Sequence, residues 1–151
     1  MTEPTRLANF LPYLLSITSN AVSDRIADEY RAHFGLKIPE WRVMAVLGDK
    51  GAATQRVLVE ATRMDKVAVN RACRGLEERD LLTRKPNSAD GRSHHLGLTT
   101  AGEKVYRAIM PMALEMESHL FSTLSPAERE LFRDFLERLR AQAETTTGPN
   151  S

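Results

Sequence analysis

One stretch of the chain, residues 65–102, restricts the possible folds more than any other part of the sequence. It reads DKVAVNRACRGLEERDLLTRKPNSADGRSHHLGLTTAG. Its first half has the spacing of an amphipathic helix with a basic outer face, and two short strand-like runs joined by a polar loop follow it. A rigid helix beside a thin basic hairpin is the winged helix-turn-helix arrangement, whose helix enters the major groove of DNA. DNA binding is therefore the first hypothesis.

The charge is unevenly distributed, although the net charge of the whole chain is only +1. Residues 63–107 carry 10 Lys and Arg against 6 Asp and Glu, a net charge of +4. Residues 1–62 are balanced at 7 and 7, and residues 108–151 carry 4 and 7, a net charge of −3. Local patches set the attraction to phosphates, so the basic middle segment fits a nucleic-acid partner. Ordinary scatter of charge on a solvated surface is the alternative.

The 151 residues fit one compact domain with helical extensions. No apolar run is long enough to cross a bilayer, and the N-terminus lacks the features of a secretion signal, so we expect a cytoplasmic protein. The one cysteine excludes an intrachain disulfide and a multi-cysteine zinc site. We find no catalytic arrangement and expect neither a metal nor a cofactor. Two of the histidines, His94 and His95, are adjacent in an expected strand and point to opposite faces.

Apolar residues at helical spacing predict a long first helix over about residues 7–33, with Pro12 inside it. Pro39 is expected to open a second helix, since proline suits a first helical turn. Gly48 and Gly51 are expected to break that helix.

Two shorter helices follow, each with a capping side chain. Thr54 is expected to cap a helix over residues 55–62, and Asp65 a helix over residues 66–80, because both side chains accept hydrogen bonds from free N–H groups. The strands of the hairpin are expected over residues 81–86 and 93–98.

The C-terminal third predicts two more helices. Thr100 and Glu103 form a capping-box pattern at the start of the first, and Pro111 is expected to bend it. The expected fold is mainly α with a small β-hairpin wing. Its organisation is a single domain over residues 1–145 with terminal helices over 7–33, 100–123 and 126–143, a winged helix-turn-helix over 39–98, and a disordered tail over 146–151.

The three terminal helices carry apolar stripes that a small DNA-reading module cannot bury by itself. We expect these stripes to form a homodimer interface, because paired modules read palindromic DNA sites. Coverage of a monomeric core is the alternative. The stripes are Leu7, Phe10, Leu11, Leu14, Ile17 and Ala21; Val105, Ile109, Met112, Met116 and Leu120; and Leu131, Phe135 and Leu139.

The helix expected over residues 66–80 has an apolar and a polar face. The inner face holds Val69, Ala72, Cys73 and Leu76. The outer face holds Lys66, Val67, Asn70, Arg71 and Arg74. Arginine bridges two acceptors of guanine, asparagine pairs with adenine, and valine touches the thymine methyl group. The outer face is therefore a candidate base-reading surface, with a merely solvated polar face as the alternative.

The expected wing adds further DNA contacts. Arg92 lies near the hairpin tip, where an arginine can enter a narrow minor groove, and Asp90 is placed to orient its guanidinium. Arg84 and Lys85, at the hairpin base, are better placed for phosphates. Residues at the start of the preceding helix are also phosphate candidates, because free N–H groups there attract anions: Thr54, Gln55 and Arg56.

Over residues 7–139 the sequence resembles the MarR family of bacterial transcriptional regulators. The resemblance rests on DKVAVNRACRGLEERDLLTR, the DGRS wing element and LTTAG, and LSPAERELFRDFLERL is similar to the last helix of the family. It implies a homodimer held by the first, fifth and sixth helices, which represses by covering palindromic promoter operators. Many members release DNA when a small aromatic or phenolic compound binds between the dimer region and the DNA-reading lobe.

The family's recognition-helix and wing positions fall on Lys66, Asn70, Arg71 and Arg92. Serine or threonine is common in the family where Val67, Ala68 and Asn70 stand, which leaves the operator sequence open.

A candidate effector site involves the second helix and the middle of the first. Trp41 can stack on an aromatic ring and Arg42 can pair with a carboxylate, as the resemblance to regulators of aromatic-acid catabolism implies. Asn20 and Ser23 are placed to line the same space. The alternative is that Trp41 belongs to the core and that Arg42 is a surface ion-pair partner.

Two other functions remain as alternatives. A redox-responsive regulator would use Cys73, although a cysteine on an apolar helix face is usually inert. A winged-helix protein-interaction module without DNA binding would be expected to carry more apolar anchors on its outer face.

Overall fold

The structure is a computed structural model that describes residues 6–86, 94–146 and 148. It is mainly α-helical with a small antiparallel sheet, as the sequence predicts. The chain divides into two compact units, Met1–Ala113 and Leu114–Ser151. Within the described residues, no helix combines the length and apolar character needed to span a membrane.

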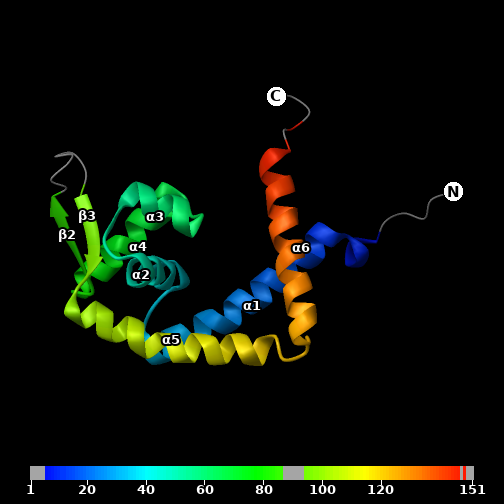
Figure 1. The fold of residues 1–151 in the computed structure, drawn as a ribbon, viewed down its shortest axis with the longest axis horizontal. Coiled ribbons are helices and arrows are strands. Elements are labelled where there is room, and N and C mark those ends of the chain that lie inside the picture. Colours follow the sequence, from blue (N-terminus) through cyan, green and yellow to red (C-terminus); the bar gives the residue numbers. More distant parts are fainter. Residues whose placement is uncertain (1–5, 87–93, 147, 149–151) are drawn as a thin grey trace. The chain divides into compact units, whose positions relative to one another are not determined.

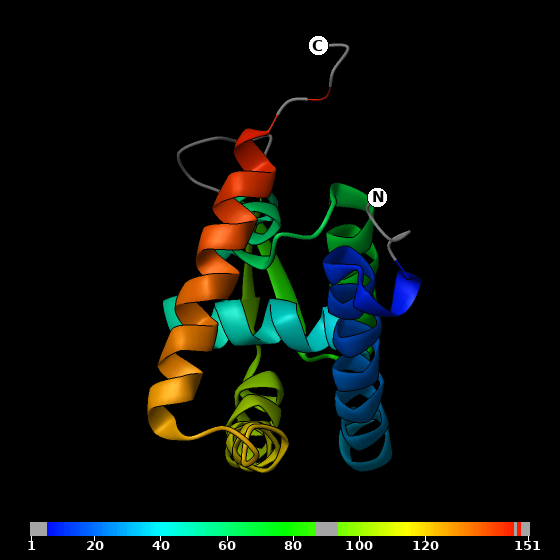
Figure 2. The same cartoon turned by 90° about the vertical axis from the view of Figure 1, so that its right-hand side faces the viewer.

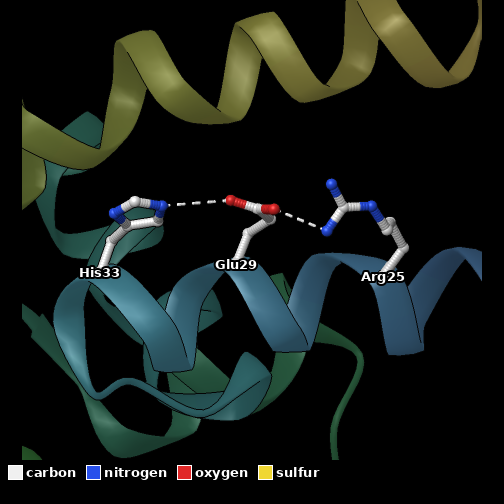
Figure 3. A network of polar contacts seen from close by, with 3 residues as sticks. All are labelled: Arg25, Glu29 and His33. Atoms are coloured by element: carbon white, nitrogen blue, oxygen red, sulfur yellow. Dashed lines mark hydrogen bonds and ion pairs between the residues drawn. The ribbon is translucent and has the colours of Figure 1, made fainter.

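Helix α1 spans Leu11–Phe34 and is preceded by a 3-10 turn, Leu7–Asn9. The predicted start near residue 7 is therefore wrong, because Pro12 occupies the first helical turn rather than the interior. The helix ends at Gly35, whose φ of 63° favours glycine. Along the second half of α1, Arg25, Glu29 and His33 form a chain of i,i+4 contacts (Figure 3).

Helix α2 spans Ile38–Lys50 and ends at Gly51, which has a φ of 83°. Gly48 lies inside the helix, so the prediction that it breaks α2 is wrong. The buried carboxylate of Glu40 accepts a hydrogen bond from the Lys37 backbone N–H at 2.9 Å, which satisfies a donor at the start of the helix.

Helices α3 (Gln55–Thr62) and α4 (Lys66–Glu78) begin at the predicted caps. The Val57 N–H donates to Oγ1 of Thr54 at 3.3 Å, and the Ala68 N–H donates to Oδ1 of Asp65 at 2.7 Å.

The sheet has the strand order β1-β3-β2. Strands β2 (Leu82–Pro86) and β3 (His94–Leu98) form the predicted hairpin. The two-residue strand β1 (Ala53–Thr54), which the sequence analysis missed, pairs with β3 so that Thr54 lies opposite His95. The first turn of α3 is therefore attached to the base of the wing.

Helix α5 spans Thr100–Leu120, with Pro111 inside it. The residue that caps it is Thr99, because the Gly102 N–H donates to the Thr99 hydroxyl at 3.0 Å. The predicted capping box of Thr100 and Glu103 is therefore wrong by one position.

Helix α6 spans Pro126–Thr145 and lies in the second unit. Ser125 and Glu128 form a capping box at its start. Arg129, in the first turn of α6, contacts the segment that precedes the helix. Its Nε donates to the carbonyl oxygens of Phe121 and Leu124 at 3.1 and 3.2 Å.

The core of the first unit lies where α2, α3 and α4 meet the sheet (Figure 1). Leu58, Val69, Leu76 and Leu96 are completely buried there. In the view of Figure 2, α2 runs crosswise to α1 within this unit. Packing on three sides leaves one face of α4 exposed.

Candidate nucleic-acid interface

The exposed face of α4 is the one that the sequence predicts to be outward. The four predicted core residues, Val69, Ala72, Cys73 and Leu76, are all buried. Val67 is 66% exposed, Asn70 is half-buried, and the three basic residues are exposed: Lys66, Arg71 and Arg74. One end of a rigid helix thus presents hydrogen-bond donors, a methyl-bearing side chain and positive charge to solvent, which is the chemistry that reads a major groove.

A close contact with α2 holds the middle of α4. A Cβ atom added to Gly75 would lie 2.2 Å from Oε2 of Glu40, so the helix backbone lies directly on that carboxylate. Glu40 also accepts the Lys37 N–H, so one carboxylate contacts both the start of α2 and the middle of α4. Sequence reasoning missed this pair; a small residue in the helix is the only local signal for it.

The start of α3 provides a second set of candidate contacts. Thr54 and Gln55 are half-buried, whereas Arg56 is exposed. Its Nε lies 3.6 Å from Oε1 of Glu60 on the same helix. Strand β1 leads directly into α3 and pairs with β3 of the wing, so the sheet connects the phosphate candidates of α3 to the wing.

At the base of the wing, Arg84 faces α4 rather than solvent. Its Nε donates to Oε1 of Glu77 at 2.7 Å, and both side chains are about one-third exposed, at 31% and 32%. Lys85 is exposed opposite His95, which is also exposed. Asp90 and Arg92 lie outside the described residues.

Cys73 lies beneath the outward face. It is fully buried, and burial raises the pKa of its thiol to about 11. The Arg84 guanidinium opposes that shift, and the Glu77 carboxylate adds to it. Within the described ranges, no three or more His, Cys, Asp or Glu side chains are grouped so that they could hold a metal ion.

The candidate effector residues lie on α1 and α2, where an aromatic cluster links three helices. The Trp41 ring lies 5.4 Å from the Tyr30 ring of α1 and stacks at 6.1 Å on the Tyr106 ring of α5. Tyr30 is buried, which raises its pKa. Trp41 is half-buried and Arg42 is exposed. Sequence reasoning identified Trp41 but missed both tyrosines: Tyr30 lies on the preceding helix, and Tyr106 lies far along the chain.

The two polar candidates of α1 are placed differently. Ser23 is half-buried and precedes Tyr30 by seven residues, which is two helical turns on the same face. Asn20 is exposed and begins the previous turn. Ser23 therefore shares a face of α1 with Tyr30, whose ring contacts Trp41.

Comparison with known proteins gives consistent matches. A family model described as MarR family matches residues 34–93. The transcriptional regulator HosA of Escherichia coli O127:H6 is 31% identical over 101 residues, which are 67% of this chain and 75% of HosA.

Solved structures match nearly the whole chain. BpsR of Bordetella bronchiseptica, whose DNA binding is regulated by 6-hydroxynicotinic acid, superposes with a TM-score of 0.85 at 25% identity, covering 91% of this chain and 98% of BpsR. MepR of S. aureus, in a complex with DNA, superposes with a TM-score of 0.81 at 26% identity, covering 89% of this chain and 98% of MepR.

Proposed function

Since this chain belongs to the MarR family of DNA-binding transcriptional regulators, we propose that it works as a homodimeric repressor of a palindromic operator, from which a small aromatic acid or phenol releases it. It is a regulator and not an enzyme. We also propose that it acts in the cytoplasm, where bacterial promoter DNA is accessible.

The observation that carries the proposal is the outward face of α4. Lys66, Arg71 and Arg74 are exposed on it, whereas the opposite face is completely packed. Burial of one face fixes the helix, so the exposed side chains need no rearrangement to enter a groove. We assign base contacts to Lys66, Val67, Asn70 and Arg71, a phosphate contact to Arg74, and the minor-groove contact to Arg92 supported by Asp90.

Phosphate contacts follow from the other basic and capping residues. We assign these to Thr54, Gln55 and Arg84. The ion pair with Glu77 holds Arg84 against α4, so its contribution depends on a terminal guanidinium nitrogen and not on Nε.

Exposed apolar faces support the homodimer. In α1 and the turn before it, Leu7 is 61% and Leu11 75% exposed; in α6, Leu131 is 55% and Phe135 53% exposed. A helix face that exposes several large apolar side chains marks an interaction site. These are two of the three stripes that the sequence predicts for the dimer; in the third, on α5, Ile109 is completely buried and the other members are half-buried. A twofold axis would present both α4 helices to one palindrome.

The aromatic cluster supports a ligand of the proposed class. Trp41 offers a half-buried ring, and Arg42 beside it offers a cation for a carboxylate. BpsR responds to 6-hydroxynicotinic acid, which is an aromatic carboxylic acid. We propose that Asn20, Ser23, Trp41 and Arg42 line the effector site.

The first test is binding to the protein's own upstream intergenic DNA, measured by gel shift with and without a panel of aromatic carboxylates. We expect binding that weakens steeply with salt and that one compound abolishes. Arg71→Ala is expected to reduce affinity roughly 5- to 150-fold, since a bidentate base contact is worth about 1–3 kcal/mol. Arg31→Ala, which removes an exposed arginine at the end of α1, serves as the control.

Each outcome separates one part of the proposal from another. Binding that no aromatic compound changes would contradict the effector assignment alone. Equal affinities of Arg71→Ala and Arg31→Ala would contradict the assignment of α4, and a monomeric protein–DNA complex would contradict the homodimer. Arg92→Ala tests the wing separately, because unchanged affinity at moderate salt would contradict its minor-groove role.

A further inference from the structure

The segment between α4 and β2 contacts the end of α1, which leads into the DNA-reading lobe, and the start of α5, which leads out of it. This segment forms a corner that consists of Arg79, Asp80 and Leu81. It contacts the end of α1 through the Arg79 side chain and the start of α5 through Thr99. Neither connection involves the outward face of α4.

Arg79 fastens the corner to α1. Its two terminal nitrogens donate to the carbonyl oxygens of Phe34 and Gly35 at 2.9 and 3.2 Å. These carbonyls lie at the C-terminus of α1, where a cation also interacts favourably with the helix dipole. Two hydrogen bonds from one planar guanidinium restrict the orientation of α1 as well as its distance.

Thr99 fastens the same corner to α5. Its hydroxyl donates to the Asp80 carbonyl oxygen at 2.6 Å and accepts from the Gly102 N–H at 3.0 Å. The Thr99 N–H donates to the Leu81 carbonyl oxygen at 3.1 Å. A Cβ atom on Gly102 would lie only 2.1 Å from that same oxygen, so the start of α5 lies directly against the corner.

We propose that Arg79 and Thr99 are positioning residues for DNA recognition, which fix the direction of α4 relative to α1 and α5 and so set the half-site spacing that the protein accepts. The proposal rests on the proposed homodimer, in which α1 and α5 contribute to the interface. The corner lies at the C-terminal end of α4, whereas Lys66 begins the helix about 20 Å away. A small rotation at the corner therefore moves the base-reading end by much more.

The test compares operators of different half-site spacing. A footprint of the protein on its own upstream DNA defines the two half-sites, and duplexes are then made with one base pair removed from or added to the centre. Affinities are measured by fluorescence anisotropy for the parent, Arg79→Ala, Arg79→Lys, Thr99→Val and Thr99→Ser. Arg107→Ala, which removes an exposed arginine that forms an ion pair with Glu103 one turn earlier in α5, is the matched control.

We expect the parent and Arg107→Ala to prefer the native spacing by roughly tenfold or more, since dimeric readers require half-sites at a fixed separation. Arg79→Ala and Thr99→Val should lose most of this preference. Thr99→Ser keeps the hydroxyl and should behave like the parent, and Arg79→Lys should be intermediate. A loss of stability alone lowers the active fraction for every operator equally and leaves the preference unchanged.

Salt dependence separates positioning from a direct DNA contact. Because Arg79 is exposed, it could instead bind a phosphate, and its loss would then reduce the slope of log affinity against log salt by about 0.9. We expect an unchanged slope. A reduced slope, or the full spacing preference in both Arg79→Ala and Thr99→Val, would overturn the proposal. A parent without any spacing preference would instead count against the homodimer itself.

Discussion

The ring of Tyr106 covers Gly48 so closely that a Cβ atom there would lie 2.5 Å from Cζ of the ring. The same ring stacks on Trp41, so a glycine of α2 and a tyrosine of α5 together complete the aromatic cluster. Glycine in a helix costs about 1 kcal/mol relative to alanine, and this packing is the reason that it is tolerated here.

Gly48→Ala is therefore expected to destabilise the protein by about 2 kcal/mol, because displacement of the ring outweighs the gain in helix propensity. The emission of Trp41, the one tryptophan, should change with it. Gly97→Ala is the control, since its Cβ would meet Ala52 at an ordinary 3.7 Å. Chemical denaturation followed by tryptophan fluorescence measures both variants. A more stable Gly48→Ala protein would show that the ring does not occupy this space.

Cys73 is expected to be unreactive in the folded protein. With its pKa raised to about 11 from 9.0, the thiolate fraction at pH 8 is roughly a hundredth of that of an ordinary cysteine, and burial blocks access. Labelling by a thiol reagent should be slow until the protein is unfolded. An exposed cysteine, Arg140→Cys in a Cys73→Ser background, should react at once. Loss of DNA binding after peroxide in the parent but not in Cys73→Ser would instead favour the redox alternative.

The parts of the fold that depend on neighbouring residues were predictable from the sequence. Thr54 and Asp65 cap α3 and α4 as expected, and the four inner residues of α4 are buried, because capping and helical periodicity are local effects. The outward face of α4, and with it the basic residues of the candidate site, followed from the same periodicity.

Two errors are local, since α1 begins later than predicted and α5 is capped by Thr99 rather than Thr100. The other error and the omissions involve contacts between distant parts of the chain. Gly48 lies inside α2, and the residue that packs on it, Tyr106, is far along the sequence. Strand β1 has only two residues, and its partner β3 is about forty residues away, so no local pattern marks it. The sequence analysis did not identify Arg79, because its acceptors are backbone carbonyl oxygens, which no residue type reveals.

The carboxylate of Glu29 is expected to titrate below the usual range. The hydrogen bond from Arg25 is the largest cause of its lowered pKa, and His33 contributes less. Because the pKa of Glu29 is lowered in the folded state, the network stabilises the protein fully at pH values above the ordinary pKa of 4.5. This contribution is lost as the pH falls through the lowered pKa. Carboxyl NMR titration should show the pKa of Glu29 rising in Arg25→Ala and less in His33→Ala. Arg56→Ala, which removes an ion pair on α3, should leave it unchanged.

The effector assignment predicts a separation between ligand response and DNA binding. Arg42→Ala should raise the aromatic-acid concentration needed to release DNA by about tenfold, because a charge-assisted hydrogen bond is lost, while DNA affinity without ligand stays the same. Arg31→Ala should change neither quantity. Binding of the acid should also quench Trp41 in the parent. A release curve of Arg42→Ala that matches the parent would remove Arg42 from the effector site.

The exposed face of α6 predicts a variant that separates dimer formation from folding. Phe135→Arg places a charge in the apolar stripe, whereas Glu137→Arg places the same side chain two residues away, outside that stripe. Phe135→Arg should weaken the dimer by at least a hundredfold, because burial of an unpaired charge in an interface costs several kcal/mol. Glu137→Arg should remain dimeric. Sedimentation equilibrium measures the association, and circular dichroism should show equal helix content. If both variants dimerise as the parent does, α6 is not part of the interface.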